Sequence, residues 1–290
     1  MELLFTLRKL EPLEKLLPFA DGVIAGKHFT TGYHLSLEEM RQAARFCKTF
    51  HKKFYIAMDD FICEDEKMLM YDYLDFIDSI DADGIFFHDL GVYNAAKSYG
   101  MLSKLIYDGK TVLCNSFDSA FFLEKGIDSV VFSRELTLEE VKGIVHNLPG
   151  RVDMQIFGHL RMSYSKRNFL TNYFRQIGRD YDFKGKETLT LVEEQREYKM
   201  PIVEDEDGTY IYTDYIFEMF SEIAELKDGL KRGIVDTLFI EDDALIAQVL
   251  RDYKRVSSSN AGFIRDSFLH NHPGNYSSGY LYQKTNIVKE

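Results

Sequence analysis

Short apolar segments alternate with helix-like segments along nearly the whole of this 290-residue chain, and this alternation limits the fold more than any other feature. Each apolar segment is four to six residues long, and nearly all are followed by a segment with the apolar spacing of a helix. Eight strands in this order favour a closed (β/α)8 barrel of the TIM-barrel type, an α/β fold, over an open sheet. The predicted strands are Glu2–Thr6, Gly22–Ala25, Phe54–Met58, Gly84–Phe87, Leu102–Tyr107, Ser129–Phe132, Met154–Phe157 and Thr237–Ile240.

Two of the helices carry clear start signals. Ser36 and Glu39 form a capping box, in which each residue satisfies a backbone donor of the other. Thr137 and Glu140 repeat the device about a hundred residues later. Because each box follows a predicted strand, the sequence predicts repeated strand–helix units rather than separate helical and sheet regions.

The predicted barrel is interrupted between its seventh and eighth strands by residues 158–213. Asp207 and Gly208 form a pair that favours a tight hairpin turn, so part of this insertion should be a β-hairpin. The expected elements are a helix at Arg167–Ile177, hairpin strands at Met200–Glu204 and Thr209–Thr213, and a returning helix at Tyr215–Lys231.

The composition changes after Arg255, where Ser, Asn and Gly become frequent. We therefore divide the chain into a barrel domain, residues 1–255, and an irregular C-terminal arm, residues 256–290, that ends in a strand-like segment. His270 and His272 lie in this arm. Two histidines without a third ligand are read more simply as loop residues, so no metal site is predicted.

The formal net charge of −12 argues against a general nucleic-acid binder, because an acidic surface repels phosphates. However, residues 158–186 hold seven Lys or Arg residues against two Asp, a net charge of +5 that leaves −17 for the rest of the chain. Aromatic residues, among them Phe169 and Tyr173, lie between these cations, a combination that can hold single-stranded RNA. The same composition also fits a solvated surface whose aromatics pack on the barrel, and the sequence leaves both interpretations open.

Cysteine usage and hydropathy indicate the compartment. The three cysteines, Cys47, Cys63 and Cys114, are far apart, which indicates reducing conditions and no disulfide framework. The N-terminus lacks a basic stretch followed by a long apolar run, and no stretch approaches 18 apolar residues. Neither a signal peptide nor a membrane span is predicted, and a cytoplasmic location is expected.

Residues that follow the strands of a barrel gather at one mouth, where such folds keep their chemistry. The stretch Asp153–Tyr173 is the richest, because its strand is expected to break at Gly158 and open into polar and basic side chains. Each of these residues could instead be a helix cap or an ion-pair partner. Ser165 and His159 would suit a hydrolase, but the nucleophile-elbow pattern is absent. The candidate site residues are Arg134, Glu135, His159, Arg161, Tyr164, Ser165, Lys166, Arg167, Arg175 and Glu241, and the same mouth should hold His28, Asp59, Asp60, His88, Asp89 and Asp242.

Several segments, in order along most of the chain, carry a family resemblance. They are GVIAGKHF, HLSLEEMRQAARFCKTFHKKFYIAMDD, DADGIFFHDLGVYNAAKSYG, NSFDSAFFLEKGIDSVVFSRELTLEEVKGI, MPIVEDEDGTYIYTDY and GIVDTLFIEDDALIAQVLRDYKR. Together they resemble the collagenase-like peptidase family U32, and the segment containing RELTLEEV is the most characteristic of them.

The chain departs from the family pattern between Gln155 and Thr171. The pattern reads E-x-F-x-H-G-A-L-C-x-x-Y-S-G-R-C-x-L-S, and Arg161 and Asn168 stand where it has cysteines. A later cysteine pair is also absent from residues 174–200. The resemblance implies that these four cysteines hold an iron–sulfur cluster in many members. Such a cluster requires thiolates, so none is expected on this chain.

The resemblance also implies a function. This short, cysteine-poor chain, with GYLYQKT at Gly279–Thr285, resembles the smaller partner of the paired tRNA wobble-uridine hydroxylation proteins of Gram-positive bacteria. That implies a cluster-free subunit in 5-hydroxylation, with a longer cysteine-bearing paralogue and tRNA as partners and prephenate as a co-substrate of the complex. The alternatives are a peptidase, as the family label says, and a barrel that binds an anionic metabolite at Arg134 and Arg161 without catalysis.

Overall fold

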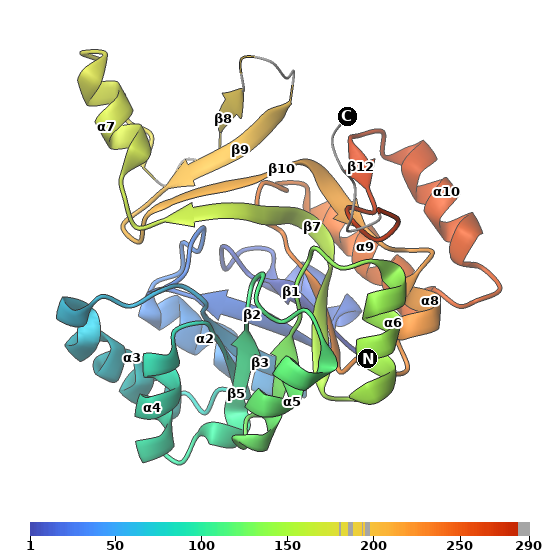
Figure 1. Cartoon of the computed structure of the whole chain (residues 1–290), viewed down its shortest axis with the longest axis horizontal. Helices are drawn as coiled ribbons and strands as arrows, with labels where there is room; N and C mark the ends of the chain where they lie inside the picture. The colour runs from blue at the N-terminus through green and yellow to red at the C-terminus, as the bar shows by residue number, and fades with distance from the viewer. Residues whose placement is uncertain (180, 185–187, 193, 195–197, 284–290) are drawn as a thin grey trace.

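Eight parallel strands form a closed barrel in the computed structural model, which describes residues 1–179, 181–184, 188–192, 194 and 198–283 (Figure 1). The last barrel strand, β11, pairs with β1 on one side and β7 on the other, which closes the ring. This confirms the predicted (β/α)8 barrel. The strands are β1 (Glu2–Thr6), β2 (Gly22–Gly26), β3 (Lys53–Met58), β4 (Gly84–Phe87), β5 (Leu105–Asp108), β6 (Ser129–Val131), the first part of β7 (Val152–Ser165) and β11 (Arg232–Val235).

Helices surround the barrel, and two begin as the sequence predicts. The backbone N–H of Ser36 donates to Glu39 at 2.7 Å, and that of Thr137 donates to Glu140 at 2.8 Å, which completes both capping boxes. The outer faces of the strands pack on these helices in one large apolar core. The helices are α1 (Leu13–Leu16), α2 (Leu37–Thr49), α3 (Lys67–Ser79), α4 (Leu90–Ser98), α5 (Ser116–Glu124), α6 (Leu138–Asn147) and α9 (Asp243–Arg255).

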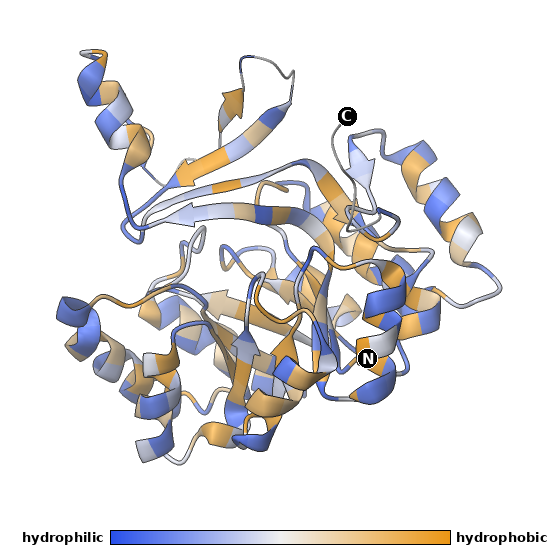
Figure 2. Cartoon of the chain, in the orientation of Figure 1, coloured by the Kyte–Doolittle hydropathy of each residue, from blue (hydrophilic) through white to orange (hydrophobic). Residues whose placement is uncertain are grey.

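The barrel interior is filled rather than hollow. Alternate strand residues such as Ile24, Phe86 and Ile106 form a separate buried cluster inside it. The end where the strands begin is closed by Arg232, whose side chain is 5 % exposed. Its guanidinium forms ion pairs with Asp153 at 3.0 Å and Asp128 at 2.6 Å. Figure 2 shows the apolar strands surrounded by helices that are apolar on one side and polar on the other.

Strand β7 does not end at Phe157 as predicted but continues to Ser165 outside the barrel. It turns at Gly158, whose φ of 112° lies in the region that favours glycine, and a Cβ there would collide with the carbonyl oxygen of Asp236. Beyond the turn the strand pairs antiparallel with β10 (Thr209–Glu218). The prediction was wrong because this distant partner extends the strand through polar residues that have no apolar pattern.

The outer sheet follows the order β7-β10-β9-β8 and lies over one end of the barrel (Figure 1). Strands β9 (Lys199–Glu204) and β10 form the predicted hairpin, and β8 (Leu189–Val192) pairs with β9. Helix α7 (Phe169–Gln176) matches the predicted helix of the insertion and projects away from the barrel in Figure 1.

The eighth barrel strand lies earlier in the chain than predicted. It is Arg232–Val235, not Thr237–Ile240, and residues 237–240 form a turn. The predicted helix Tyr215–Lys231 is also wrong, because β10 runs to Glu218 and only the short α8 (Ile223–Leu226) follows. The strand begins with Arg232, so its four residues lack a clear apolar pattern. The carboxylates that pair with Arg232, those of Asp128 and Asp153, are distant in the sequence.

We predicted an irregular C-terminal arm, but part of it is regular. Residues Ala261–Asn271 form helix α10, and Phe268 packs against Phe157 and Phe220 of the main core. Strand β12 (Tyr276–Ser277) pairs with β10. Residues 280–283 of the predicted final strand form a turn, and the remainder lies outside the described residues. No helix in the described part of the chain is long and apolar enough to cross a membrane.

Candidate functional site at the barrel mouth

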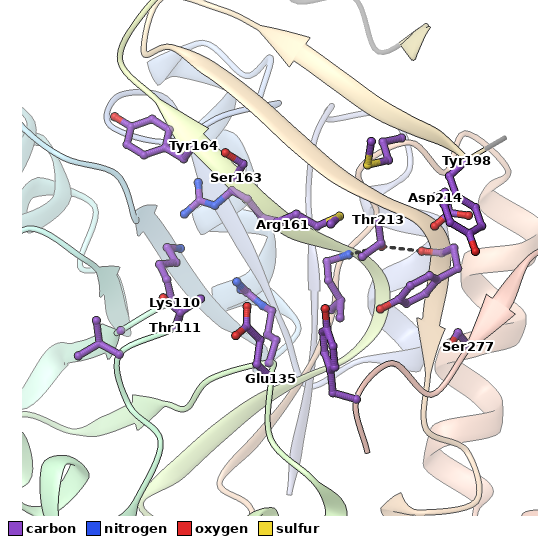
Figure 3. Close-up of a pocket in the computed structure, with 18 of the residues that line it drawn as sticks. Lys110, Thr111, Glu135, Arg161, Ser163, Tyr164, Tyr198, Thr213, Asp214 and Ser277 are labelled. Atoms are coloured by element: carbon purple, nitrogen blue, oxygen red, sulfur yellow. Dashed lines mark hydrogen bonds between the residues drawn. The ribbon is translucent and has the colours of Figure 1, made fainter. Parts of the chain in front are cut away.

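A cavity of about 770 Å³ lies between the mouth of the barrel and the inner face of the outer sheet. The loops after β3, β4, β5 and β6 form one wall, β7 and β10 form the opposite wall, and residues 275–280 of the C-terminal arm close one side. Figure 3 shows Lys110 and Glu135 from the barrel loops, Arg161 and Tyr164 from β7, and Ser277 from the arm around this space. The cavity is therefore at the end of the barrel where TIM-type folds keep their sites.

Paired carboxylates at the end of β3 hold Arg161 in place. The Asp60 carboxylate accepts hydrogen bonds from Arg161 at 2.6 Å and from the Tyr210 hydroxyl at 2.8 Å. Burial raises the pKa of Asp60 above its ordinary value, although the Arg161 charge opposes this. Burial would also raise the pKa of Asp59, but Lys110 and Arg161 hold it well below the ordinary value. The charge of Arg161 is thus already neutralised by ion pairs with Asp59 and Asp60.

Lys110 connects the ends of two strands. Its ammonium contacts Asp59 and lies 2.7 Å from a carboxylate oxygen of Asp108. Its backbone has a φ of 56°, which is uncommon for a residue other than glycine. Burial would raise the pKa of Asp108, but Lys110 and Arg134 lower it, so this carboxylate stays ionised. Backbone strain of this kind is often kept where a side chain must be aimed at a site.

Arg134 is a cation at the mouth that these ion pairs leave incompletely satisfied, as is Arg8, whose Nε also lacks a partner among the described residues although its guanidinium pairs with Asp236 at 2.6 Å. The carboxylate closest to Arg134 is Asp108, 3.6 Å away, and the buried Nε of Arg134 has no hydrogen-bond partner among the described residues. The buried hydroxyl of Tyr164 is also without a partner there. Buried polar atoms normally have partners, and both residues line the cavity. They are the donors that a bound ligand would satisfy.

Large apolar side chains surround the opening. Phe61 is 48 % exposed and its ring stacks on that of Tyr164, with 5.6 Å between the ring centroids. Val112, Met162, Tyr198 and Tyr280 also line the cavity and are more than 40 % exposed. A contiguous exposed apolar rim is typical of a binding surface. The cavity thus combines an apolar, aromatic rim with a floor in which three cations, Lys110, Arg134 and Arg161, meet three carboxylates.

The structure brings four of the predicted site residues together and places the others elsewhere. Arg134, Glu135, Arg161 and Tyr164 line the cavity. Ser165 is the last residue of β7. Lys166 and Arg167 lie between β7 and α7, and Arg175 is part of α7. Glu241 lies in a separate hollow beside α9, because the strand that it was expected to follow ends at Val235. Of the further mouth residues, Asp60 and His88 line the cavity.

His159 and Ser165 do not form a nucleophile–base pair. They are six residues apart on β7, a separation of about 20 Å in an extended strand. The Nδ1 of His159 donates to the carbonyl oxygen of Thr213 at 2.7 Å, and burial lowers the pKa of this imidazole. Ser165 Oγ accepts from the backbone N–H of Arg167 at 3.2 Å. This geometry gives no support to the peptidase alternative.

The residues present do not fit an iron–sulfur cluster. Arg161 stands at one of the positions where the family pattern has cysteine, and its guanidinium is bound to Asp60. Asn168, at the other, precedes α7. The three cysteines are unpaired, and the described residues contain no group of three or more metal-ligating side chains. A cluster needs several thiolates at one place, which this part of the chain lacks.

Sequence reasoning missed several cavity residues. Lys110 follows β5, which we predicted at Leu102–Tyr107 and which spans Leu105–Asp108. The acidic residue Asp108 could have indicated where this strand ends. Tyr198, Tyr276 and Tyr280 come from the insertion and the C-terminal arm, which had no predicted position relative to the barrel. No local pattern could have indicated them.

An eight-stranded α/β barrel with its cavity at the carboxyl ends of the strands defines a TIM-barrel-type protein with a mouth site. The chain belongs to peptidase family U32, whose family model matches residues 23–285. It is similar to tRNA hydroxylation protein P2 of Bacillus subtilis (strain 168), with 29 % identity over 197 residues, which are 67 % of this chain and 64 % of that protein. It is also similar to tRNA hydroxylation protein P1 of the same strain, with 24 % identity over 59 % of this chain and 42 % of that protein. The matched part is thus less than two thirds of the length of either relative.

A solved structure described as the U32 peptidase Mk0906 has the same fold. It matches 81 % of this chain and 92 % of its own chain, with a TM-score of 0.50 and 12 % sequence identity. At this identity the likeness concerns the barrel architecture alone. It agrees with the closed ring of eight parallel strands and carries no information about substrate.

Proposed function

We propose that this chain is a cluster-free subunit in the 5-hydroxylation of the wobble uridine of tRNA. The similarity to tRNA hydroxylation proteins supports the reaction. The observation that carries the proposal is the mouth cavity, where an unsatisfied arginine lies beneath an exposed aromatic rim. Such a cavity can hold a planar base against aromatic rings while a cation binds an acidic group.

The floor of the cavity is the proposed site for prephenate as co-substrate. A carboxylate can satisfy the free Nε of Arg134 and form a charge-assisted pair with its guanidinium. Arg161 cannot serve equally, because Asp60 and Asp59 already neutralise it. Of the two arginines that the sequence indicated as anion ligands, we therefore propose Arg134 alone.

The basic segment after β7 is the proposed contact for tRNA. Arg167 and Arg175 are exposed near α7, and their charges suit the phosphates of a folded RNA. Lys166 contributes less, because its ammonium is 2.6 Å from the Glu66 carboxylate. The tRNA substrate would place the reaction in the cytoplasm.

A longer, cysteine-bearing paralogue is the proposed partner. Because Arg161 and Asn168 cannot ligate iron, a cluster needed for the reaction would have to come from another protein. Two relatives of this chain, P1 and P2, come from one bacterial strain, which supports the expectation of paired paralogues.

Deleting the gene in a strain without redundant pathways tests the proposal. We expect 5-hydroxyuridine at the wobble position to disappear in mass spectrometry of the tRNA, and the tagged chain to copurify with the paralogue. Unchanged 5-hydroxyuridine in the deletion strain would refute the function.

The second candidate is a barrel that binds an anionic metabolite without catalysis, which the unsatisfied Arg134 also favours. In that case prephenate should raise the melting temperature of the purified chain, while deletion leaves tRNA modification unchanged.

A further inference from the structure

The imidazole of His88 is held in one tautomer beside the mouth cavity. His88 directly follows β4, is half-buried and lines the cavity. Its Nδ1 lies 2.8 Å from the backbone carbonyl oxygen of Asp108. Because a carbonyl oxygen can only accept, Nδ1 must carry a hydrogen, and Nε2 of the neutral ring is left with a lone pair.

The carbonyl group that selects this tautomer is itself fixed in place. Asp108 is the last residue of β5 and is 6 % exposed. Its carboxylate accepts from the backbone N–H of Lys110 at 3.1 Å and from the Lys110 ammonium at 2.7 Å. The His88 ring also lies parallel to that of Tyr107, with 6.3 Å between centroids, and forms a T-shaped contact with Phe61 at 4.7 Å. These contacts keep Nε2 in one position, which directional recognition of a ligand requires.

Nε2 of His88 differs chemically from the charged groups around it. Lys110, Arg134 and Arg161, the cations of the floor, can donate hydrogen bonds but cannot accept them. Within the described residues, the hydrogen bond of the His88 ring is the one from Nδ1, so Nε2 has no partner there. His88 therefore adds a neutral acceptor to the wall of the cavity.

Phe61 places this acceptor next to an aromatic surface. Its ring contacts His88 and also stacks on Tyr164, with 5.6 Å between the centroids. The hydroxyl-bearing residues Thr111 and Ser163 line the same cavity and lie on either side of it in Figure 3. Proteins that read single-stranded RNA stack a base on aromatic rings and bond to its Watson–Crick edge. The cavity offers both kinds of contact.

We propose that Nε2 of His88 accepts the N3–H of the target uracil, whose ring lies against Phe61 and Tyr164. This inference rests on the proposed function, which supplies the base. The hydroxyls of Thr111 and Ser163 can donate to the two carbonyl oxygens that flank N3. His88 is then the residue that determines which pyrimidine the cavity takes.

The fixed tautomer opposes cytosine. Cytosine has a lone pair at N3, which would face the lone pair of Nε2. To bind it, the His88 ring would have to move its hydrogen from Nδ1 to Nε2. Nδ1 and the Asp108 carbonyl oxygen, 2.8 Å apart, would then be two acceptors without a hydrogen between them.

An ionised acid is a poor ligand for Nε2, because carboxylate oxygens also only accept. The acid proposed as co-substrate pairs with Arg134 instead. The base and the acid would therefore occupy different parts of one cavity of about 770 Å³.

Two substitutions separate recognition of the base from a purely structural role of His88. The amide of Asn ends near the position of Nδ1, so His88→Asn can still donate to the Asp108 carbonyl but has no acceptor at the position of Nε2. The longer amide of Gln reaches near Nε2, so His88→Gln keeps an acceptor there and gives up the bond to Asp108. Each variant is expressed at the wild-type level in the deletion strain, and 5-hydroxyuridine in tRNA is measured by mass spectrometry.

We expect 5-hydroxyuridine to stay within about twofold of the wild-type level in His88→Gln and to fall at least about tenfold in His88→Asn. The melting temperatures should show the opposite order, with His88→Asn unchanged and His88→Gln lower by about 2–4 °C. Equal modification in the two variants, or more in His88→Asn, would overturn the proposal. Failure of the proposed function is seen separately, because the deletion alone would then leave 5-hydroxyuridine unchanged.

Binding of anticodon stem–loops tests the choice of base. The full-length chain, in the form in which it purifies from its host, should bind a loop with uridine at the wobble position at least about tenfold more tightly than the same loop with cytidine. His88→Asn should lose this preference. A wild-type chain that does not distinguish the two loops, or a His88→Asn chain that distinguishes them equally well, would overturn the proposal.

Discussion

Each end of the barrel holds an arginine, and Arg232 at the closed end differs from Arg134 at the mouth in how fully its guanidinium is satisfied. At the closed end, Arg232 donates to the Tyr55 hydroxyl, Ser129, Asp153 and Asp128, with distances of 2.6–3.1 Å. At the mouth, Arg134 reaches only Asp108, at 3.6 Å, and its Nε lacks a partner in the described residues. A satisfied cation holds strands together, whereas an unsatisfied one beside a cavity is available to a ligand.

Replacing the satisfied arginine should have the largest effect on stability. Arg232→Met leaves the buried Asp153 without its cation, so the free energy of unfolding should fall by about 3–5 kcal/mol. Urea denaturation measures this change. The control is Arg151→Met at the same end, whose exposed side chain bonds to the backbone carbonyls of Asp128 and Ile127 within the described residues and should cost far less. Equal losses in both variants would contradict the structural role of Arg232.

The bend that carries β7 from the barrel to the outer sheet should be the next most sensitive position. Gly158→Ala combines an unfavourable φ with a collision against Asp236, and we expect a loss of about 1–3 kcal/mol together with loss of the cavity wall. Gly150→Ala is the matched control, because its φ of 70° is also positive but its Cβ would meet no atom within 4 Å. If both variants lose the same stability, the collision contributes nothing.

The mouth also contains a carboxyl group that should make stability depend on pH near neutrality. Burial, followed by the charges of Asp205 and Asp60, raises the pKa of Asp207 to about 7. A raised pKa in the folded state means that the protonated form is favoured, so its stabilising contribution is present below about pH 4 and is lost as the pH rises through 7. Because the side chain is partly exposed, we expect a loss on the order of 1–2 kcal/mol between pH 5 and pH 8.

Urea denaturation at several pH values measures this dependence. The variant Asp207→Asn cannot ionise, so it should lack the decline between pH 5 and pH 8. A wild-type chain whose stability is flat over this range would contradict the raised pKa.

The barrel could be predicted from the sequence because its signals are local. Short apolar strands, the capping boxes at Ser36 and Thr137 and the Asp207-Gly208 turn each depend on a few adjacent residues. The continuation of β7 past Gly158 could not be predicted, because it depends on pairing with β10 some fifty residues away. Arg232 concealed the last strand because its partners come from β6 and β7 and the loop before β6.

The sequence predicted that Arg134 and Arg161 lie at the barrel mouth but not the balance of charges there. The sequence indicated Arg134 and Arg161 as equivalent cations at the mouth. Arg161 is instead neutralised by Asp60, a residue 101 positions away, and only the three-dimensional arrangement reveals this. Lys110 and Tyr210 were missed for the same reason, since each meets its carboxylate partners across the barrel mouth.

Replacing the unsatisfied arginine should have the smallest effect on stability and a large effect on function. Arg134→Met keeps the length of the side chain and removes an ion pair that is already long, so the free energy of unfolding should change by about 0.5 kcal/mol or less. Urea denaturation checks this value against the loss in Arg232→Met.

The most direct test of the account is the 5-hydroxyuridine content of tRNA in a deletion strain that expresses Arg134→Met at the wild-type level. We predict that wild-type chain restores the modification and that Arg134→Met, although stably folded, does not. Full restoration by Arg134→Met would contradict the claim that the unsatisfied arginine at the barrel mouth is the functional one.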